Sequence, residues 1–244
     1  MEPKIKIQEY SYNLPQERIA KYPLEKRDSS KLLIYNKGEI SQSVFTSLPS
    51  FLPQGSLMVF NNTRVVPARL FFRKETGAVI EIFCLEPVNP SDYAVSFASS
   101  ECCSWNVVIG NARKWKSGEV YLICDEANLE AKRLNLRAEL VAKGENNGSV
   151  VKFVWDGGVS FSEVLDICGK IPIPPYLKRD TESLDLERYQ TLYAKFRGSV
   201  AAPTAGLHFT EKVMNDIASN GVELVNVCLH VGAGTFLPVK SSLV

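Results

Sequence analysis

The chain has 244 residues, 45% of them hydrophobic and 23% charged, and a formal net charge of +1 at pH 7. This is the composition of an ordinary globular protein, and the length suffices for one large domain or two modest ones. The near-neutral charge argues against a sequence-independent coat for nucleic acid, and no apolar run is long enough to span a membrane. The first ten residues lack the apolar core of a signal peptide, so we expect a cytoplasmic protein without membrane contact.

The first sixty residues contain short elements separated by turn signals. In chain order we expect a strand at 5–7, a short helix after Asn13, a hairpin pairing 31–35 with 39–43 around Asn-Lys-Gly, a helical segment at 44–52 and a buried strand at 57–60. These elements form the first part of a mixed α/β domain.

After Pro67 the composition changes to short β-like segments separated by glycine-containing turns. Such spacing predicts a small barrel or sandwich, with strands at 69–73, 78–85, 93–98, 105–109, 119–124, 134–142 and 149–155. Since Pro67 and Gly157-Gly158 flank this series, we predict that residues 67–155 are a β-barrel domain. It is inserted into an α/β (mixed α+β) domain made of residues 1–66 and 156–244. The run Arg113-Lys114-Trp115-Lys116 suits nucleic-acid contact but is equally typical of a hairpin tip.

The last third is predicted to be mixed. We expect helices at 161–168, 185–196 and 211–219, an extended proline-rich segment at 171–176 and a strand at 225–231. In that strand Val225, Val227, Leu229 and Val231 alternate as one buried face. His230 is then expected at the carboxyl end of the strand, where ligands of open α/β sheets bind.

The six cysteines show no metal-binding or disulfide pattern. Their spacing matches no zinc motif, and without a secretory context a disulfide framework is not expected. We interpret Cys84, Cys124 and Cys228 as small apolar side chains on strands. No metal site is predicted.

Two stretches rich in small residues, 198–210 and 229–236, each contain one of the two histidines of the chain. Small side chains permit close approach of backbone to a ligand, and histidine titrates nearest to neutral pH. Either stretch alone is equally compatible with a tight turn and a structural histidine. Because both histidines fall in such stretches, we favour a ligand site with proton-transfer groups.

Six runs resemble one family closely, and together they cover nearly all of the chain outside the predicted barrel. They are Tyr22–Ser30 (YPLEKRDSS), Val59–Arg69 (VFNNTRVVPAR), Gly169–Tyr176 (GKIPIPPY), Tyr189–Ala194 (YQTLYA), Gly198–Thr210 (GSVAAPTAGLHFT) and Leu229–Phe236 (LHVGAGTF). The family is that of the S-adenosylmethionine:tRNA ribosyltransferase-isomerases of queuosine biosynthesis. Its members continue past the Gly-Thr-Phe-x-Pro-Val stretch, so this chain is expected to be a C-terminally truncated member.

The resemblance implies an α/β domain with an inserted barrel, and it implies a reaction. The ribosyl part of S-adenosylmethionine moves onto 7-aminomethyl-7-deazaguanine at the wobble position of a tRNA anticodon, giving epoxyqueuosine. S-adenosylmethionine is then the cosubstrate, no metal is required, the partner is tRNA, and a monomer is expected. The sulfonium acidifies the adjacent C–H, so a general base is needed, and adenine leaves more easily when a general acid protonates it.

Candidate residues follow from this chemistry and the matched motifs. His208 and His230 are the hypothesised proton-transfer pair, with Tyr189 and Asp28 as further catalytic candidates. Guanidinium groups suit a carboxylate or phosphate, amides and hydroxyls suit a ribose or base edge, and aromatic rings suit base stacking. The substrate-binding candidates are Arg27, Asn61, Asn62, Thr63, Arg64, Arg69, Tyr176, Gln190, Tyr193, Pro203, Thr204, Gly206, Phe209, Gly232, Gly234, Thr235 and Phe236.

Two other functions stay open at this point. One is a catalytically incomplete tRNA-binding fragment of the same family. The other is a small-molecule α/β transferase whose glycine turns hold phosphate, although the chain has no Gly-x-Gly-x-x-Gly or P-loop pattern.

Overall fold

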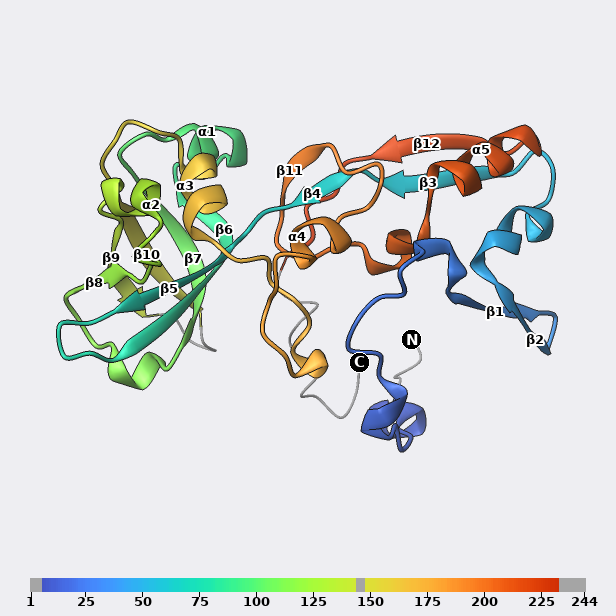
Figure 1. The fold of residues 1–244 in the computed structure, drawn as a ribbon, viewed down its shortest axis with the longest axis horizontal. Helices are drawn as coiled ribbons and strands as arrows, with labels where there is room; N and C mark the ends of the chain where they lie inside the picture. The colour runs from blue at the N-terminus through green and yellow to red at the C-terminus, as the bar shows by residue number, and fades with distance from the viewer. Residues whose placement is uncertain (1–5, 144–147, 233–244) are drawn as a thin grey trace, which may run out of the picture.

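The computed structural model describes residues 6–143 and 148–232, and Figure 1 shows them as two regions side by side, a barrel and a main region. The strands of the barrel are β5 (Arg69–Arg73), β6 (Val79–Asn89), β7 (Cys102–Gly110), β8 (Glu119–Leu122), β9 (Arg137–Lys143) and β10 (Gly148–Val154). They close in the order β10-β7-β6-β5-β8-β9, with every neighbouring pair antiparallel. The predicted fold class, a mixed α/β protein containing a small β-barrel, is confirmed.

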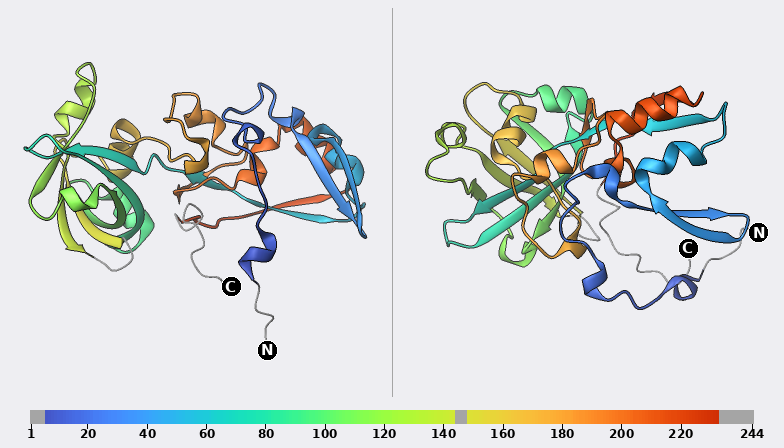
Figure 2. Two further views of the ribbon diagram at one scale, coloured as in Figure 1. Left: turned by 90° about the horizontal axis from the view of Figure 1, so that it is seen from below. Right: turned by 45° about the vertical axis from the view of Figure 1, so that its right-hand side comes forward.

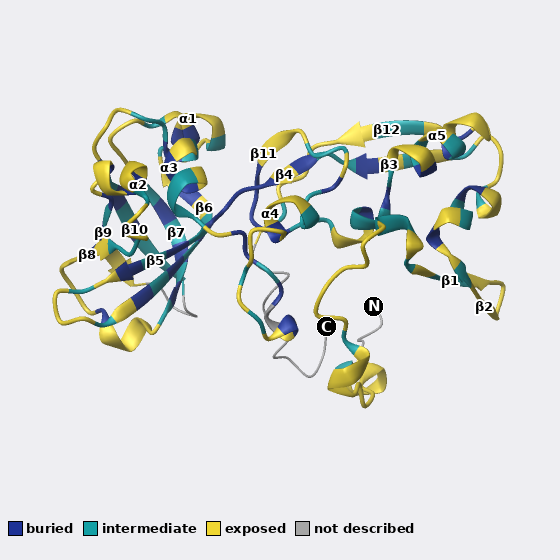
Figure 3. Ribbon diagram, in the orientation of Figure 1, coloured by how far each residue is buried: buried dark blue, intermediate teal, exposed yellow. Residues whose placement is uncertain are grey.

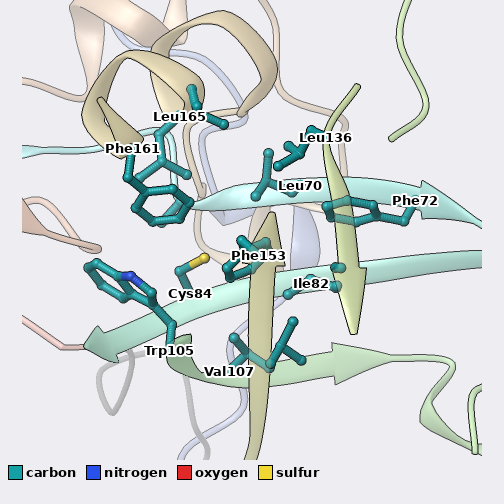
Figure 4. Close-up of a cluster of buried hydrophobic side chains, with 14 of the residues drawn as sticks. Leu70, Phe72, Ile82, Cys84, Trp105, Val107, Leu136, Phe153, Phe161 and Leu165 are labelled. Carbon is teal, nitrogen blue, oxygen red and sulfur yellow. The ribbon is translucent and has the colours of Figure 1, made fainter. Parts of the chain in front are cut away.

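The core of the barrel is formed by alternate residues of its strands and by one helix laid against them. Leu70, Phe72 and Ile82 are fully buried, and Figure 4 shows them pointing toward Phe153 and its neighbours. The helix is α3 (Phe161–Cys168), whose first residue packs within 5.5 Å of the Trp105 ring, centroid to centroid. Ser160 and Glu163 cap α3 reciprocally in a capping box. Because α3 shares this core, it packs on the barrel although it follows residue 155, the predicted end of the barrel domain. The domain boundaries therefore stay a prediction.

Two predicted strands of the barrel region are wrong in whole or in part. Residues 93–98 form a helix, α1 (Tyr93–Ala98), because the Asp92 carboxylate accepts the Val95 amide and caps it. The strand predicted from residue 134 begins at Arg137, since Leu134 is the C-cap of α2 (Leu129–Arg133).

Trp115 is fully buried after the short 3₁₀ helix η5 (Ala112–Lys114), and its indole N–H donates to the Gly118 carbonyl at 2.9 Å. It is therefore not available to stack on nucleic acid.

The main region contains three separate two-stranded ribbons. β1 (Lys31–Asn36) and β2 (Glu39–Val44) form the predicted hairpin, β3 (Leu57–Asn61) pairs in parallel with β12 (Glu223–Val227), and β4 (Thr63–Val65) pairs in parallel with β11 (Phe196–Ser199). The predicted helix α5 (Glu211–Ser219) packs with Phe45 and Phe60 in a small core. Figure 3 shows buried residues gathered in the barrel strands and β4, whereas β1 and β2 are mainly exposed.

The rest of the main region is made of short turns of helix. They are η1 (Ile7–Tyr10), η2 (Gln16–Arg18), η3 (Arg27–Ser29), η4 (Phe45–Phe51), η7 (Pro175–Leu177), α4 (Asp185–Arg188) and η8 (Thr204–His208). The strand predicted at 5–7 is wrong for residue 7, which begins η1, while residue 5 lies outside the described residues. The helix predicted at 185–196 ends at Arg188, because the chain then turns back to form β11.

The strand predicted at 225–231 ends at Val227 as β12, and its expected buried face is wrong because Leu229 is 61% exposed. Beyond β12 the Asn61 side chain replaces the ladder: its amide nitrogen donates to the Leu229 carbonyl at 2.9 Å, and its oxygen accepts the Leu229 amide at 3.0 Å. Cys84 is buried on β6 as expected. Cys124 and Cys228 lie beyond the ends of β8 and β12, and Cys228 is exposed, so the interpretation of these two as apolar side chains on strands is wrong.

The two regions meet where the chain enters and leaves the barrel. Arg69 and Lys170 form an antiparallel bridge there, with hydrogen bonds of 3.2 and 2.8 Å between their backbones. Gly169 lies so close to this crossing that a Cβ atom would stand 1.9 Å from the Pro67 carbonyl oxygen. Figure 2 shows from two further directions that the connections run next to each other.

Candidate functional site

His208 is positioned by the short helix η8 and by the aromatic core beneath it. Phe209, the next residue, is buried edge-on against Phe45 and Phe60, with ring centroids 5.0 and 5.2 Å apart. The His208 ring itself lies 5.4 Å from the Phe45 ring. The buried phenylalanine thus anchors the end of η8 and leaves the imidazole at the border between the core and a cavity.

The small residues of η8 have a packing role. A Cβ atom on Gly206 would stand 2.1 Å from the Tyr193 hydroxyl oxygen, so only glycine allows η8 to approach that ring. Burial raises the pKa of Tyr193 to about 12, so its phenol is neutral at physiological pH. Pro203 precedes η8 as its N-cap residue, and Thr204 begins it.

A cavity of about 690 Å³, here called the histidine cavity, brings together five of the predicted site residues: Arg27, Tyr176, Tyr189, Thr204 and His208. Tyr22 also lines it, and its cationic lining residues are Arg18, Lys21, Arg27, Lys31 and Arg188. Among the described residues that line it there is no aspartate or glutamate. A cavity with cations and aromatic rings on its walls attracts an anionic ligand that carries a flat base.

The wall of the histidine cavity is held by guanidinium groups that donate to backbone carbonyls. Arg27 donates to the carbonyls of Gln190 at 2.6 Å and Glu187 at 2.7 Å. Arg188 donates in the opposite direction, to the Glu25 carbonyl at 2.9 Å. These contacts fix the N-terminal segment to the segment after α4. Burial, followed by the charge of Arg188, lowers the pKa of Arg27.

Two further catalytic candidates have defined surroundings. Burial, followed by repulsion from Tyr176, raises the pKa of Tyr189 to about 12, so this phenol is a hydrogen-bond donor at neutral pH. The Asp28 carboxylate accepts the Thr210 hydroxyl at 2.9 Å, and that hydroxyl oxygen in turn accepts the Val213 amide to cap α5. Asp28 is thereby linked to the start of α5.

A second cavity, of about 570 Å³, shares Arg27 with the first, and we call it the Arg64 cavity. Arg64, Gln190 and Phe209, all predicted site residues, line it. The Gln190 side chain pairs with the backbone of Val65, accepting its amide at 3.0 Å and donating to its carbonyl at 2.8 Å. Thr191 lines the cavity as well.

His230 lies in different surroundings from His208. Its ring stacks on Tyr93 of α1, with centroids 4.9 Å apart and planes inclined by 15°. Gly198 also packs against the His230 ring, so closely that a Cβ atom on Gly198 would stand 2.2 Å from the imidazole. In the described residues no hydrogen bond or ring contact joins the two imidazoles, so the proton-transfer pair stays a prediction.

The other candidates hold the backbone around these groups. The Thr63 hydroxyl donates to Ser199 Oγ at 2.9 Å, and that oxygen accepts the Val231 amide. The buried Asn62 Oδ1 has no partner within the described residues. Arg69 pairs with Glu81 beside the junction, outside both cavities. Gly232 is described and exposed, whereas Gly234, Thr235 and Phe236 lie outside the described residues.

The sequence interpretation missed several lining residues: Arg18, Lys21, Tyr22, Lys31, Arg188 and Thr191. Tyr22 and Thr191 fall within two of the matched motifs, so these motifs could have identified them as candidates. The cations carry no local signal, because isolated surface lysines and arginines look the same.

The comparisons with known proteins agree on one family. A family model described as "Queuosine biosynthesis protein" matches residues 7–244. Proteins named S-adenosylmethionine:tRNA ribosyltransferase-isomerase are similar: that of Natranaerobius thermophilus is 40% identical over 240 residues, covering 97% of this chain and 63% of its own length. That of Desulfitobacterium hafniense is 42% identical, with 97% of this chain and 63% of its own length covered. The chain therefore spans just under two thirds of the length of these relatives.

A solved structure is also similar in sequence. It is an S-adenosylmethionine tRNA ribosyltransferase from Thermotoga maritima, 26% identical, with 91% of this chain and 58% of that chain covered and a TM-score of 0.33. In the described residues no group of three or more histidine, cysteine or acidic side chains is arranged to hold a metal ion. No helix within residues 6–143 or 148–232 has the length and apolar character needed to cross a membrane.

Proposed function

Because the chain belongs to the family of queuosine biosynthesis proteins, we propose that it takes part in ribosyl transfer from S-adenosylmethionine to tRNA. The acceptor is 7-aminomethyl-7-deazaguanine at the wobble position, and the product is epoxyqueuosine. The observation that carries the proposal is the histidine cavity, in which residues of four matched motifs meet. The names of the relatives, which combine S-adenosylmethionine, tRNA and ribosyl transfer, support the same reaction.

The reaction needs proton transfers at defined atoms. The C–H next to the sulfonium must lose a proton before the ribosyl unit rearranges. The electron pair left on that carbon forms a new carbon–carbon bond within the ribosyl unit as adenine leaves with a proton. The acceptor amine loses a proton as its nitrogen bonds to the ribosyl unit, and a ribosyl oxygen then displaces the sulfur as methionine, which closes the epoxide. We assign the proton removal to His208, because it is the one histidine that lines the histidine cavity. A positioned general base contributes about 10²–10⁴ in rate.

The tyrosines and cations of the histidine cavity serve binding in this proposal. Tyr189 keeps its proton at neutral pH, so it donates a hydrogen bond to a substrate oxygen or nitrogen. Tyr22 and Tyr176 present rings to unstacked anticodon bases. The cationic rim then neutralises RNA phosphates, so binding weakens as salt rises. We also propose that the protein is cytoplasmic and acts as a monomer. Sedimentation velocity tests the oligomeric state.

The test is incubation of the chain with S-adenosylmethionine and tRNA carrying the aminomethyl base, followed by mass spectrometry of the tRNA nucleosides. Epoxyqueuosine formation supports the enzyme, and tRNA binding without product supports the non-catalytic alternative. In single-turnover experiments at saturating tRNA, His208→Ala is expected to lose at least about tenfold in rate. His230→Ala tests the predicted partner in the same way. If both variants lose less than tenfold, the histidine assignment is wrong.

A further inference from the structure

The Arg64 cavity contains a cation that has no partner. Arg64 is exposed on β4, and in the described residues its guanidinium makes no hydrogen bond or ion pair. Its register neighbour on β11, Arg197, is by contrast paired with Asp166 at 2.6 Å. An arginine that lines a cavity with all of its donors free is suited to a planar carboxylate, which it binds through two parallel hydrogen bonds.

Further donors in or next to the lining of this cavity have no acceptor among the described residues. Thr191 lines the cavity and is only 5% exposed, yet its buried hydroxyl oxygen has no partner among the described residues. The amides of Glu211 and Lys212, at the start of the nine-residue helix α5, donate to no acceptor in the described chain. A buried hydroxyl without a partner is unfavourable, and a ligand that pairs with it removes this penalty.

The cavity also contains acids, which narrow the class of ligand. Glu187 and Glu211 line it, and neither carboxylate forms an ion pair within the described residues. The carboxylates of Glu187 and Glu211 would repel a ligand that carries only negative charge, such as phosphate. A ligand with a positive and a negative group can pair one group with a carboxylate and the other with the Arg64 guanidinium. Leu186, Leu192 and Phe209 supply an apolar part of the wall. The lining thus matches an α-amino acid with an apolar side chain.

We infer that the Arg64 cavity binds the α-amino-acid head group of methionine, either in S-adenosylmethionine or as the released product. The carboxylate lies on Arg64 and the Thr191 hydroxyl, and the ammonium lies on Glu187 or Glu211. This inference rests on the proposed function for its choice of amino acid. Arg27 lines both this subsite and the histidine cavity.

The first test needs neither RNA nor turnover. L-methionine is titrated into the full chain by calorimetry, beside 4-(methylthio)butanoate, which lacks the ammonium, and 3-(methylthio)propylamine, which lacks the carboxylate. We expect methionine to bind at least about tenfold more tightly than either analogue, since each analogue lacks one of the two charged groups that the subsite pairs. No methionine binding, or equal binding of an analogue, would overturn the inference.

The second test places the ligand. Arg64→Gln and Thr191→Val are each expected to weaken methionine binding, the first by at least about tenfold. Arg73→Gln, which removes an exposed arginine on β5 of the barrel, is the matched control and is expected to leave binding unchanged. An equal effect of Arg64→Gln and Arg73→Gln contradicts the inference.

The third test separates the two sources and the two proposals. If S-adenosylmethionine is the natural source, Arg64→Gln raises its KM with little change in kcat. If only the released product binds there, the variant relieves inhibition by methionine and leaves the KM unchanged. A wild-type chain that binds methionine through Arg64 but forms no epoxyqueuosine refutes the proposed function alone. Turnover with neither effect in Arg64→Gln refutes this inference alone.

Discussion

In the barrel six strands close on themselves, whereas in the described main region six strands form three separate ribbons. The closed sheet has no unpaired edge, and its large core includes Phe72, Trp105 and Phe153. The main region has a small core around Phe45 and Phe60. Parallel strands are usually covered on both faces, yet Leu57 on β3 is 59% exposed.

The main region is held instead by polar side chains that replace missing backbone partners. Asn61 and Gln190 each pair with a backbone amide and carbonyl, and Arg27 and Arg188 join segments more than a hundred residues apart. The difference teaches that the barrel depends on buried apolar area, while the part that carries the candidate site depends on a few hydrogen-bonded connections. Loss of one connection leaves several polar groups without partners.

The chain provides separate reporters for the two regions. Its three tryptophans all lie in the barrel and are at most 2% exposed, so tryptophan fluorescence follows barrel unfolding. His208 lies in the main region, so its NMR signal follows that region, whereas the His230 ring stacks on Tyr93 of α1 and reports the contact between the regions.

The largest effect is expected for Phe161→Ala. Its ring is fully buried and lies 5.3 Å from Phe153 and 5.4 Å from Trp155, centroid to centroid. Removing it leaves a cavity and costs about 3–5 kcal/mol of barrel stability. Urea unfolding followed by tryptophan fluorescence measures the loss, and Phe196→Ala, at a ring 48% exposed in the main region, is the control. If the native His208 signal disappears at the same lowered urea concentration, the two regions unfold as one unit and the comparison fails.

A smaller effect, on the other region, is expected for Arg179→Ala. Arg179 forms two 2.7 Å hydrogen bonds with Asp185, and the side chains are 8% and 2% exposed. Removing one partner of a buried pair costs about 3 kcal/mol, the lower end of the usual range because the arginine is near the surface. The His208 signal is expected to report the loss, with tryptophan fluorescence unchanged. Arg197→Ala, whose pair with Asp166 is exposed, is the control and should cost about 0–1 kcal/mol.

The Arg179 contribution is expected to depend on pH. Burial by itself raises the pKa of Asp185, but the Arg179 hydrogen bonds, the Glu182 amide and the Arg179 charge together hold it below its ordinary value of 3.8. The stabilisation is therefore present above that value and is lost as the pH falls through the lower pKa of the folded state. The difference between wild type and Arg179→Ala should shrink below about pH 4. A difference that grows on acidification would contradict this assignment.

The smallest effect is expected where the regions touch. At Gly198 the φ angle is +147°, and an added Cβ would collide with the His230 ring. Gly198→Ala should move His230 away from Tyr93, which removes the ring-current shift of its NMR signals and leaves barrel stability unchanged. Gly77→Ala is the matched control, because Gly77 also has a positive φ, of 85°, but has open space around it. An unaltered His230 signal in Gly198→Ala would show that the stacked arrangement is not populated.

Turn and spacing patterns in the sequence correctly predicted those elements whose contacts are close in the chain. The Asn-Lys-Gly turn between β1 and β2 has positive φ angles at Lys37 and Gly38, as such hairpin turns require. The barrel was predicted from the spacing of its strands. Asp92, three residues before Val95, is the N-cap signal that would have identified α1 as a helix.

The remaining differences arise from contacts distant in sequence. The end of β12 is determined by the Asn61 side chain, which no pattern in residues 225–231 reveals. His208, Tyr189 and Tyr176, which line the histidine cavity, were named as candidates from the sequence because the matched motifs supply those residues. Its cationic rim was not predicted, since Arg18 and Arg188 come together only through the fold.

The paired backbones of Arg69 and Lys170 give the barrel adjacent points of entry and exit, with Gly169 allowing the strands to cross without a clash. A module whose ends lie side by side is an exchangeable cassette, because a short peptide bridges its attachment points without deforming the host. The same seam therefore offers an engineer a place to graft another small domain, chosen for the RNA it recognises, beside an unchanged main region.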